Sequence, residues 1–168
     1  MGRYRPPVPA SSPYITREGY QSLADELKAL WKRRAGVTRA LTAAAAEGDR
    51  SENAEYIYRK KELREIDRRI RYLQKRLPDL KVVARQPSDP TVIFFGAWVT
   101  VEDSEGTQCC FRIVGADEFD PAKGWISMDS PMARALMKKT LDDEVRVETP
   151  QGCCEYTITG IRYTLSGD

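Results

Sequence analysis

Two long segments in the first half of the chain carry apolar residues at alternating spacings of three and four positions. Such spacing places an apolar seam along one side of a helix, as in coiled coils. Only about three or four residues separate the segments, so we expect them to form an antiparallel hairpin. The seam residues are Tyr20, Leu23, Leu27, Leu30, Arg34 (an interruption), Val37, Leu41 and Ala44 in residues 16–47, and Tyr56, Arg59, Leu63, Ile66, Ile70, Leu73 and Leu77 in residues 51–77.

Residues that typically cap or end helices lie at the ends of the two predicted helices. Thr16 can cap the first helix, and Gly48 can end it. Pro78 ends the second helix, because proline has no backbone N–H and cannot continue it. At about 1.5 Å per residue, each arm of roughly 30 residues would be about 45 Å long.

The hydrophobic period changes after residues 85–91, which we expect to be a linker. Beyond it, short runs rich in β-branched and aromatic residues predict strands. We therefore expect an α+β protein with an extension at 1–14 that we predict to be disordered, a coiled-coil hairpin domain at 15–84, and a small, mainly antiparallel β domain at 92–168. The predicted strands are 92–95, 97–101, 110–114, 125–128, 144–147 and 156–158, with turns at 104–106 and 150–152 and a short helix at 130–137.

Composition narrows the class of protein only a little. The 168 residues are 41% hydrophobic, which is enough for at least one core. The net charge of +2 does not by itself indicate a nucleic-acid partner, so local charge has to decide. No apolar run reaches the length of a membrane span or a signal peptide, and we expect a cytoplasmic protein.

The four cysteines form two adjacent pairs, Cys109-Cys110 and Cys153-Cys154, and the chain contains no histidine. Zinc ligands of one pair are usually separated by two or more residues, so this pattern does not favour a zinc site. Both pairs lie in strand-like segments, where neighbouring side chains point to opposite faces. We expect reduced thiols that serve as packing residues.

The segment from Gly48 to Ala54 would form the tip of the predicted hairpin, and it carries the acids Asp49 and Glu52. One interpretation is helix capping, with Asp49 accepting from first-turn amides and Glu52 near the positive end of the helix dipole. The other is metal binding, because acids three positions apart share a face. Two carboxylates are too few to enclose Mg²⁺, so a partner would have to supply further ligands.

Basic residues follow one face of the second predicted helix. Glu62, Glu65 and Asp67 interrupt them, so the pattern allows an ordinary solvated surface with weak ion pairs. It also allows phosphate contacts to a nucleic-acid strand without recognition of its sequence. We call the basic set Lys60, Lys61, Arg64, Arg68, Arg71 and Lys75 the basic stripe.

These features together resemble the bacterial Gre transcript-cleavage factors, and the GreB branch more than the GreA branch. The dense basic stripe and the Phe-Phe-Gly-Ala-Trp run point to GreB. The resemblance covers the chain from about residue 15 to near its end. It is carried by residues 15–20 (Ile-Thr-Arg-Glu-Gly-Tyr), 48–56, 60–73, 94–99 (Phe-Phe-Gly-Ala-Trp-Val), 111–115 and 126–136.

The resemblance implies a coiled-coil hairpin followed by an FKBP-like β domain with a short helix. It implies a transcription elongation factor that binds RNA polymerase through its secondary channel and stimulates Mg²⁺-dependent endonucleolytic cleavage of backtracked nascent RNA, rescuing arrested complexes. Asp49 and Glu52 match the family's tip acids, which help to hold a Mg²⁺ ion in the polymerase active site. The basic stripe matches the surface that meets the 3′ end of backtracked RNA, and Asp129, Ser130 and Pro131 match the polymerase-docking segment.

Further expectations concern the activity, location and oligomeric state of the protein. The protein would not be an enzyme alone but would activate the cleavage activity of RNA polymerase, with which it would associate at the nucleoid. It would be a monomer, since the hairpin seam is satisfied within the chain. A non-cleaving channel regulator is the main alternative. A prolyl isomerase, suggested by the FKBP-like fold alone, is a weaker one.

Overall fold

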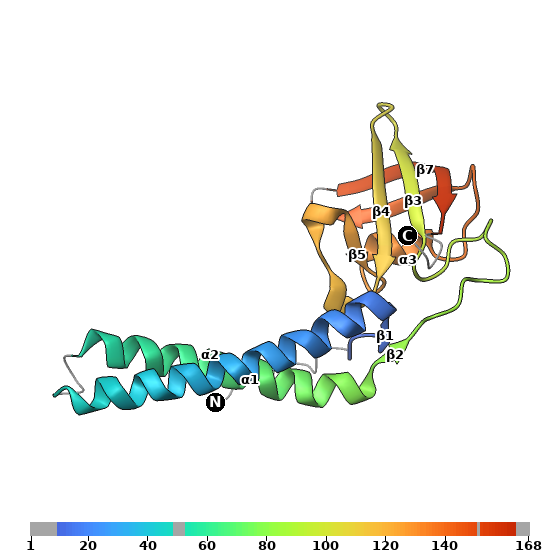
Figure 1. The fold of residues 1–168 in the computed structure, drawn as a ribbon. Coiled ribbons are helices and arrows are strands. Elements are labelled where there is room, and N and C mark those ends of the chain that lie inside the picture. The colour runs from blue at the N-terminus through green and yellow to red at the C-terminus, as the bar shows by residue number, and fades with distance from the viewer. Residues whose placement is uncertain (1–9, 49–52, 151, 164–168) are drawn as a thin grey trace, which may run out of the picture. The chain divides into compact units, whose positions relative to one another are not determined.

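The computed structural model describes residues 10–48, 53–150 and 152–163 of the chain, and Figure 1 shows its elements. The chain divides into two compact units. Residues 20–80 form a helical unit, and residues up to Gly19 group with those from Lys81 onward in a β-rich unit. The boundaries predicted at 15–84 and 92–168 stay predictions. In the described part of the chain, no helix is long and apolar enough to cross a membrane.

The helical unit is the predicted hairpin. Helix α1 spans Arg17–Ala46 and α2 spans Ala54–Arg76, so both lie within about three residues of the predicted bounds. A 3-10 turn, η1, follows at Leu77–Asp79 and contains Pro78, as expected for a proline that ends an α-helix. The predicted coiled-coil hairpin is therefore confirmed.

Apolar residues of the predicted seams hold the two helices together. Val37 of α1 packs with Ile66 and Ile70 of α2 in a buried cluster. Arg34, the interruption in the first seam, reaches Asp67 of α2 instead of entering the core, and its Nε lies 2.7 Å from the carboxylate. Leu27, Leu30 and Leu63 pack against the cluster.

Both helix starts are capped by side chains. Thr16 precedes α1, and its hydroxyl accepts a hydrogen bond from the amide of Gly19 at 3.0 Å, which confirms the predicted cap. Asn53 caps α2, and its side-chain oxygen accepts from the amide of Tyr56 at 3.1 Å. Asn53 is therefore the N-cap of α2, whereas Asp49, to which we gave a capping interpretation, lies outside the described residues.

The β-rich unit contains a five-stranded sheet. Its strands are β3 (Trp98–Asp103), β4 (Gln108–Val114), β5 (Trp125–Ser127), β6 (Glu144–Thr149) and β7 (Gly152–Arg162). Their order is β5-β4-β3-β7-β6, and all neighbours are antiparallel except the parallel pair β4 and β5. The predicted α+β class and mainly antiparallel sheet are therefore confirmed, whereas the FKBP-like description stays a prediction.

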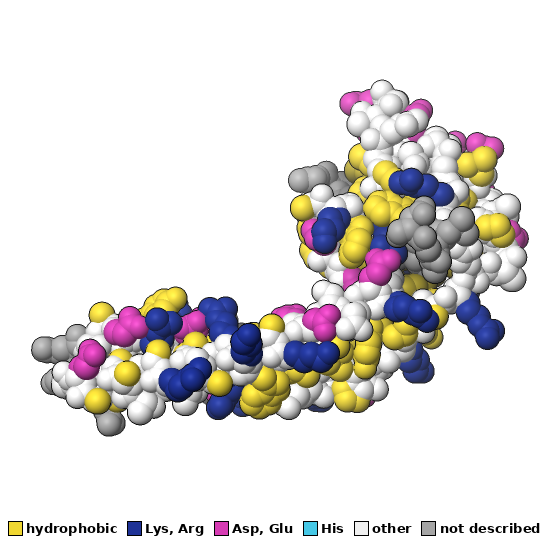
Figure 2. Space-filling view, in the orientation of Figure 1, with side chains coloured by type: hydrophobic (Ala, Val, Ile, Leu, Met, Phe, Trp, Pro, Cys, Tyr) yellow, Lys and Arg dark blue, Asp and Glu magenta, His cyan; other side chains and the backbone are white. Residues whose placement is uncertain are grey.

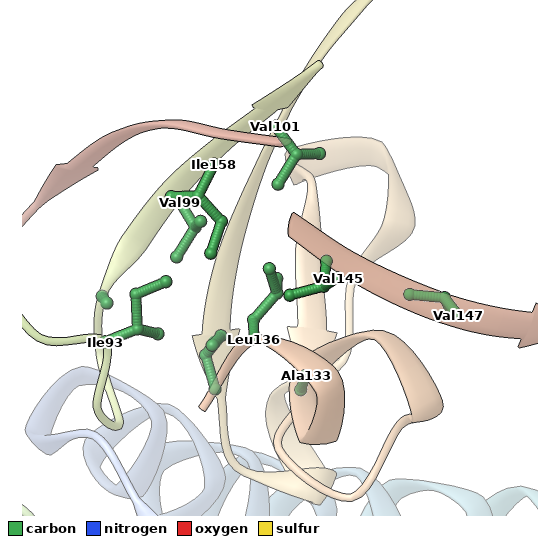
Figure 3. Close-up of a cluster of buried hydrophobic side chains, with 10 residues drawn as sticks. Ile93, Val99, Val101, Ala133, Leu136, Val145, Val147 and Ile158 are labelled. Carbon is green, nitrogen blue, oxygen red and sulfur yellow. The ribbon is translucent and has the colours of Figure 1, made fainter. Parts of the chain in front are cut away.

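Helix α3 (Pro131–Leu136) packs against the sheet and contributes Ala133 and Leu136 to its buried core. Figure 3 shows Ala133 and Leu136 of this helix beside inward-facing strand residues such as Val99, Val145 and Ile158. Buried positions alternate with half-buried ones in β3 and with exposed ones in β6, so each strand has one face toward this core. The predicted short helix, with Ser130 as cap and Pro131 in its first turn, is confirmed.

A short parallel pair of strands ties the two ends of the hairpin sequence to each other. Strand β1 (Tyr14–Ile15) pairs with β2 (Lys81–Val82), and neither strand was predicted. The amide of Lys81 also donates to the carbonyl of Pro13 at 2.7 Å. The predicted disorder of residues 1–14 is therefore wrong for 12–14, whereas residues 1–9 lie outside the described part.

Two further predictions from the second half of the chain are wrong. Residues 92–95 form no strand, because their backbone groups bond outside any ladder: the hydroxyl of Tyr163 accepts from the Phe94 amide at 2.9 Å and donates to the Val92 carbonyl at 2.6 Å. The cysteines are free thiols, as expected, but Cys109, Cys110 and Cys153 are exposed and do not serve as packing residues.

Candidate nucleic-acid interface

The tip acids Asp49 and Glu52 lie outside the described residues, but the helix ends that flank them are described. Helix α1 ends at Ala46, and Gly48 follows with a φ of +136°, a conformation that favours glycine. The side-chain amide of Asn53 donates to the carbonyl of Ala44 at 2.9 Å. Asn53 therefore joins the two helix ends next to the tip as well as capping α2.

The basic stripe lies on the solvent side of α2. All six side chains are exposed, and Figure 2 shows Lys and Arg side chains along the visible face of the hairpin. With about 3.6 residues per turn, the six positions fall within an arc of about 100° around the helix axis. This arc excludes the buried seam residues Ile66, Ile70 and Leu73. The stripe is thus one continuous face.

Two of the three acids that interrupt the stripe in sequence bind cations of α1. Glu62 accepts from Arg33 with an N–O distance of 2.6 Å, and Asp67 pairs with Arg34 at 2.7 Å. Within the described residues, none of the six stripe cations forms an ion pair. These six positive charges therefore stay available to a partner, and the sequence's two interpretations, an ordinary solvated surface or a phosphate-binding one, both stay open.

The ion pairs across the hairpin also fix the ionisation of Glu62. Its pKa lies below its ordinary value, chiefly because the Arg33 guanidinium donates to the carboxylate, with a further hydrogen bond from Arg59. Glu62 is therefore held as an anion inside the hairpin seam, where it is only 9% exposed.

The three residues of the predicted docking segment precede and begin α3. The hydroxyl of Ser130 accepts from the amide of Ala133 at 3.2 Å, so this residue has a structural role as a helix cap. The carboxylate of Asp129 accepts from the amide of Ser12 at 2.9 Å and also from the Ser12 hydroxyl. Sequence reasoning missed this contact, because the residues are 117 positions apart.

Comparisons with known proteins identify the family of the chain. The family model "Transcription elongation factor, N-terminal" matches residues 13–82, and "Transcription elongation factor, GreA/GreB, C-term" matches residues 87–163. The chain belongs to the GreA/GreB family. It is 61% identical over 155 residues to transcription elongation factor GreB of Yersinia pestis, a match that covers 92% of this chain and 91% of the relative. It is 57% identical to GreB of Pseudomonas aeruginosa over 97% of this chain and 98% of the relative.

Solved structures give a weaker likeness. The GreA factor homolog 1 (Gfh1) of Thermus thermophilus is 26% identical with a TM-score of 0.40, covering 89% of this chain and 97% of that one. A GreA/GreB factor from Nitrosomonas europaea is 23% identical with a TM-score of 0.42, covering 56% and 79%. The assignment to the GreA/GreB family therefore depends on the sequence matches.

This GreA/GreB family member also carries a row of stacked side chains that sequence reasoning missed. Trp98 of β3 lies between Arg112 and Arg162 in the sheet register, and Arg112 pairs in turn with Trp125 of β5. The Arg112 guanidinium carbon lies 5.9 Å from one indole centroid and 5.0 Å from the other, and a carboxylate oxygen of Glu18 is 3.2 Å from its Nη1. Such cation–π contacts stabilise the face of the sheet opposite the core.

Proposed function

We propose that this GreA/GreB family member is a transcript-cleavage factor. It would bind RNA polymerase through the secondary channel and stimulate Mg²⁺-dependent endonucleolytic cleavage of backtracked nascent RNA, so that arrested complexes resume elongation. The observation that carries this proposal is the basic stripe: six exposed cations without an acidic partner among the described residues, on the helix that leads away from the acidic tip. A protein with these features would act as a cofactor of another active site rather than as an enzyme alone.

Asp49 and Glu52 are the residues that would hold a Mg²⁺ ion together with the polymerase. Carboxylate oxygens are ligands that Mg²⁺ prefers, but two of them leave most of its coordination shell to other groups. The described residues contain no group of three or more His, Cys, Asp or Glu side chains that could hold a metal ion. The shared ion would activate a water molecule and stabilise the charge that develops at the phosphodiester.

The other residues of the chain position the RNA and the protein. The basic stripe would hold the extruded RNA by its phosphates, without recognition of the bases. The pairing of Glu62 with Arg33 and of Asp67 with Arg34 keeps two acids away from that RNA. Asp129, Ser130 and Pro131 would contact the polymerase at the channel mouth.

RNA cleavage in a defined backtracked elongation complex tests the proposal. Wild-type protein with Mg²⁺ should give shortened transcripts that can be extended again, and Asp49→Asn should abolish cleavage while polymerase binding is largely retained. Because Asn53 caps α2, this substitution leaves the helix start intact. If wild-type protein binds polymerase but no RNA is cleaved, the protein is a non-cleaving regulator of the secondary channel.

A further inference from the structure

A groove on the hairpin contains an exposed indole beside the basic stripe. Trp31 of α1 is 46% exposed, although exposing an indole to water costs much more free energy than exposing the polar side chains around it. The groove has a volume of about 450 Å³, which is in the range of small-ligand sites. Its lining comes from both helices: Trp31, Arg34, Asp67, Ile70, Arg71 and Gln74.

One face of this indole is already supported. The guanidinium carbon of Arg34 lies 5.8 Å from the ring centroid of Trp31, within the range of a cation–π contact. Arg34 is held in turn by Asp67, whose carboxylate oxygen is 2.7 Å from its Nε. The indole is therefore braced by a residue that an ion pair fixes, which reduces the conformational entropy lost when a planar ligand stacks on the ring.

The rim of the groove is continuous with the basic stripe. Arg71 belongs to both, and its Nε donates to the backbone carbonyl of Asp67 at 3.2 Å, which leaves its other guanidinium nitrogens for a partner. The single acid in the groove, Asp67, is neutralised by Arg34. The combination of a stacking surface and an uncompensated cation fits single-stranded nucleic acid, whose bases stack on aromatic rings while its phosphates bind cations.

We propose that Trp31 is a base-stacking subsite for the extruded segment of the nascent RNA. The subsite would bind one unpaired base of any sequence between the indole and solvent, with Arg71 on a neighbouring phosphate. This inference rests on the proposed function, since it takes the RNA along the hairpin from the tip. It adds a contact to the base face, which the stripe cations do not provide.

The position of Trp31 along α1 determines how many extruded nucleotides are needed to reach it. Residues 31 to 46 of α1 span about 22 Å at about 1.5 Å per residue. With bases stacked at about 3.4 Å, this distance corresponds to about seven nucleotides. Trp31 should therefore matter when about ten nucleotides have been extruded and should have no effect when only two have been.

The experiment uses the full chain and two elongation complexes, backtracked by two and by about ten nucleotides, with 5-iodouridine at successive extruded positions. Photo-crosslinking should join residue 31 to a base about seven nucleotides from the cleaved bond. In the long complex, Trp31→Ala should raise the protein concentration for half-maximal cleavage by about 5- to 160-fold, the loss expected for one stacked base. Trp31→Phe should retain most of the effect.

Tyr72→Ala is the matched control, because this ring is also exposed, at 43%, but does not line the groove. It should leave both complexes unchanged. An equal effect of Trp31→Ala on both complexes, or a crosslink from residue 31 to polymerase protein instead of RNA, would overturn the subsite. If wild-type protein fails to cleave even the short complex, the proposed function fails, and the crosslink still decides whether RNA contacts Trp31.

Discussion

Gly19 offers a sharp test of how α1 is anchored, because a methyl group at this position has no room. A Cβ built on Gly19 lies 2.1 Å from Oε1 of Glu118 and 2.3 Å from its carboxyl carbon. Ordinary contacts begin near 3.4 Å, so the carboxylate would have to move by more than about 1 Å. Glu118 is only 8% exposed, so it has little room to move.

The expected cost follows from the hydrogen bonds of Glu118. Its carboxylate accepts from the amide of Thr16 at 3.0 Å, from the Thr16 hydroxyl, and from the amide of Gly115 at 2.9 Å. Hydrogen bonds to charged groups contribute about 1.5–3 kcal/mol each, so losing two of them costs about 3–6 kcal/mol. The higher helix propensity of alanine offsets at most about 1 kcal/mol. We therefore expect Gly19→Ala to lower the free energy of unfolding by about 2–5 kcal/mol.

Gly36 provides the control within the same helix. A Cβ at Gly36 meets no atom within 4 Å, so Gly36→Ala should raise the free energy of unfolding by about 0.5–1 kcal/mol. Urea denaturation followed by circular dichroism and tryptophan fluorescence measures both variants. In the Glu118→Ala background, Gly19→Ala should lose its destabilising effect. If Gly19→Ala proves as stable as Gly36→Ala in the otherwise wild-type chain, the close contact with Glu118 does not anchor the helix.

Two further predictions concern charges on the hairpin. Since the folded pKa of Glu62 lies below its ordinary value of 4.5, its contribution to stability is complete above that pH and is lost as the pH falls through the lower folded value. Urea midpoints should therefore fall below about pH 4.5 in the wild type and fall less in Glu62→Gln; equal losses would contradict the pairing with Arg33. Separately, Arg68→Ala should reduce the slope of log affinity against log salt concentration by about 0.7 in backtracked complexes. Arg69→Ala, whose guanidinium pairs with Glu26 at 2.7 Å, should change the slope less.

The helical hairpin could be predicted because its signal is local and repeated. Each seam contains several turns with the same spacing, so single exceptions such as Arg34 do not change the outcome. The error at residues 92–95 has the opposite origin. Ile93 is fully buried in the core, as an apolar run suggests, but its backbone bonds to Lys138 and Lys139 rather than to a strand. A short apolar run indicates that its residues are buried. Its backbone hydrogen-bond partners depend on residues far away in the sequence.

The candidate site also has one part that could be predicted from local sequence and other parts that depend on distant residues. The basic stripe could be predicted because six cations on one helix follow its period. The pairing of Asp67 with Arg34, 33 positions apart, depends on the register between two helices, which periodicity alone leaves open. The same limit applies to the contact of Ser12 with Asp129 and to the groove beside Trp31. Each of these features requires knowing which residues face each other across separate elements.

The register between the helices explains why the hairpin can be both stable and basic. Cations on one face of a helix repel one another unless acids lie nearby. Three acids of α2 lie within the stretch of sequence that carries the stripe. The register brings Arg33 and Arg34 of α1 to two of these acids, Glu62 and Asp67. The negative charge of these acids therefore stabilises the packing of the two helices through ion pairs. The stripe then keeps its positive potential toward solvent, where it acts on a phosphate backbone over about 8–10 Å at moderate salt.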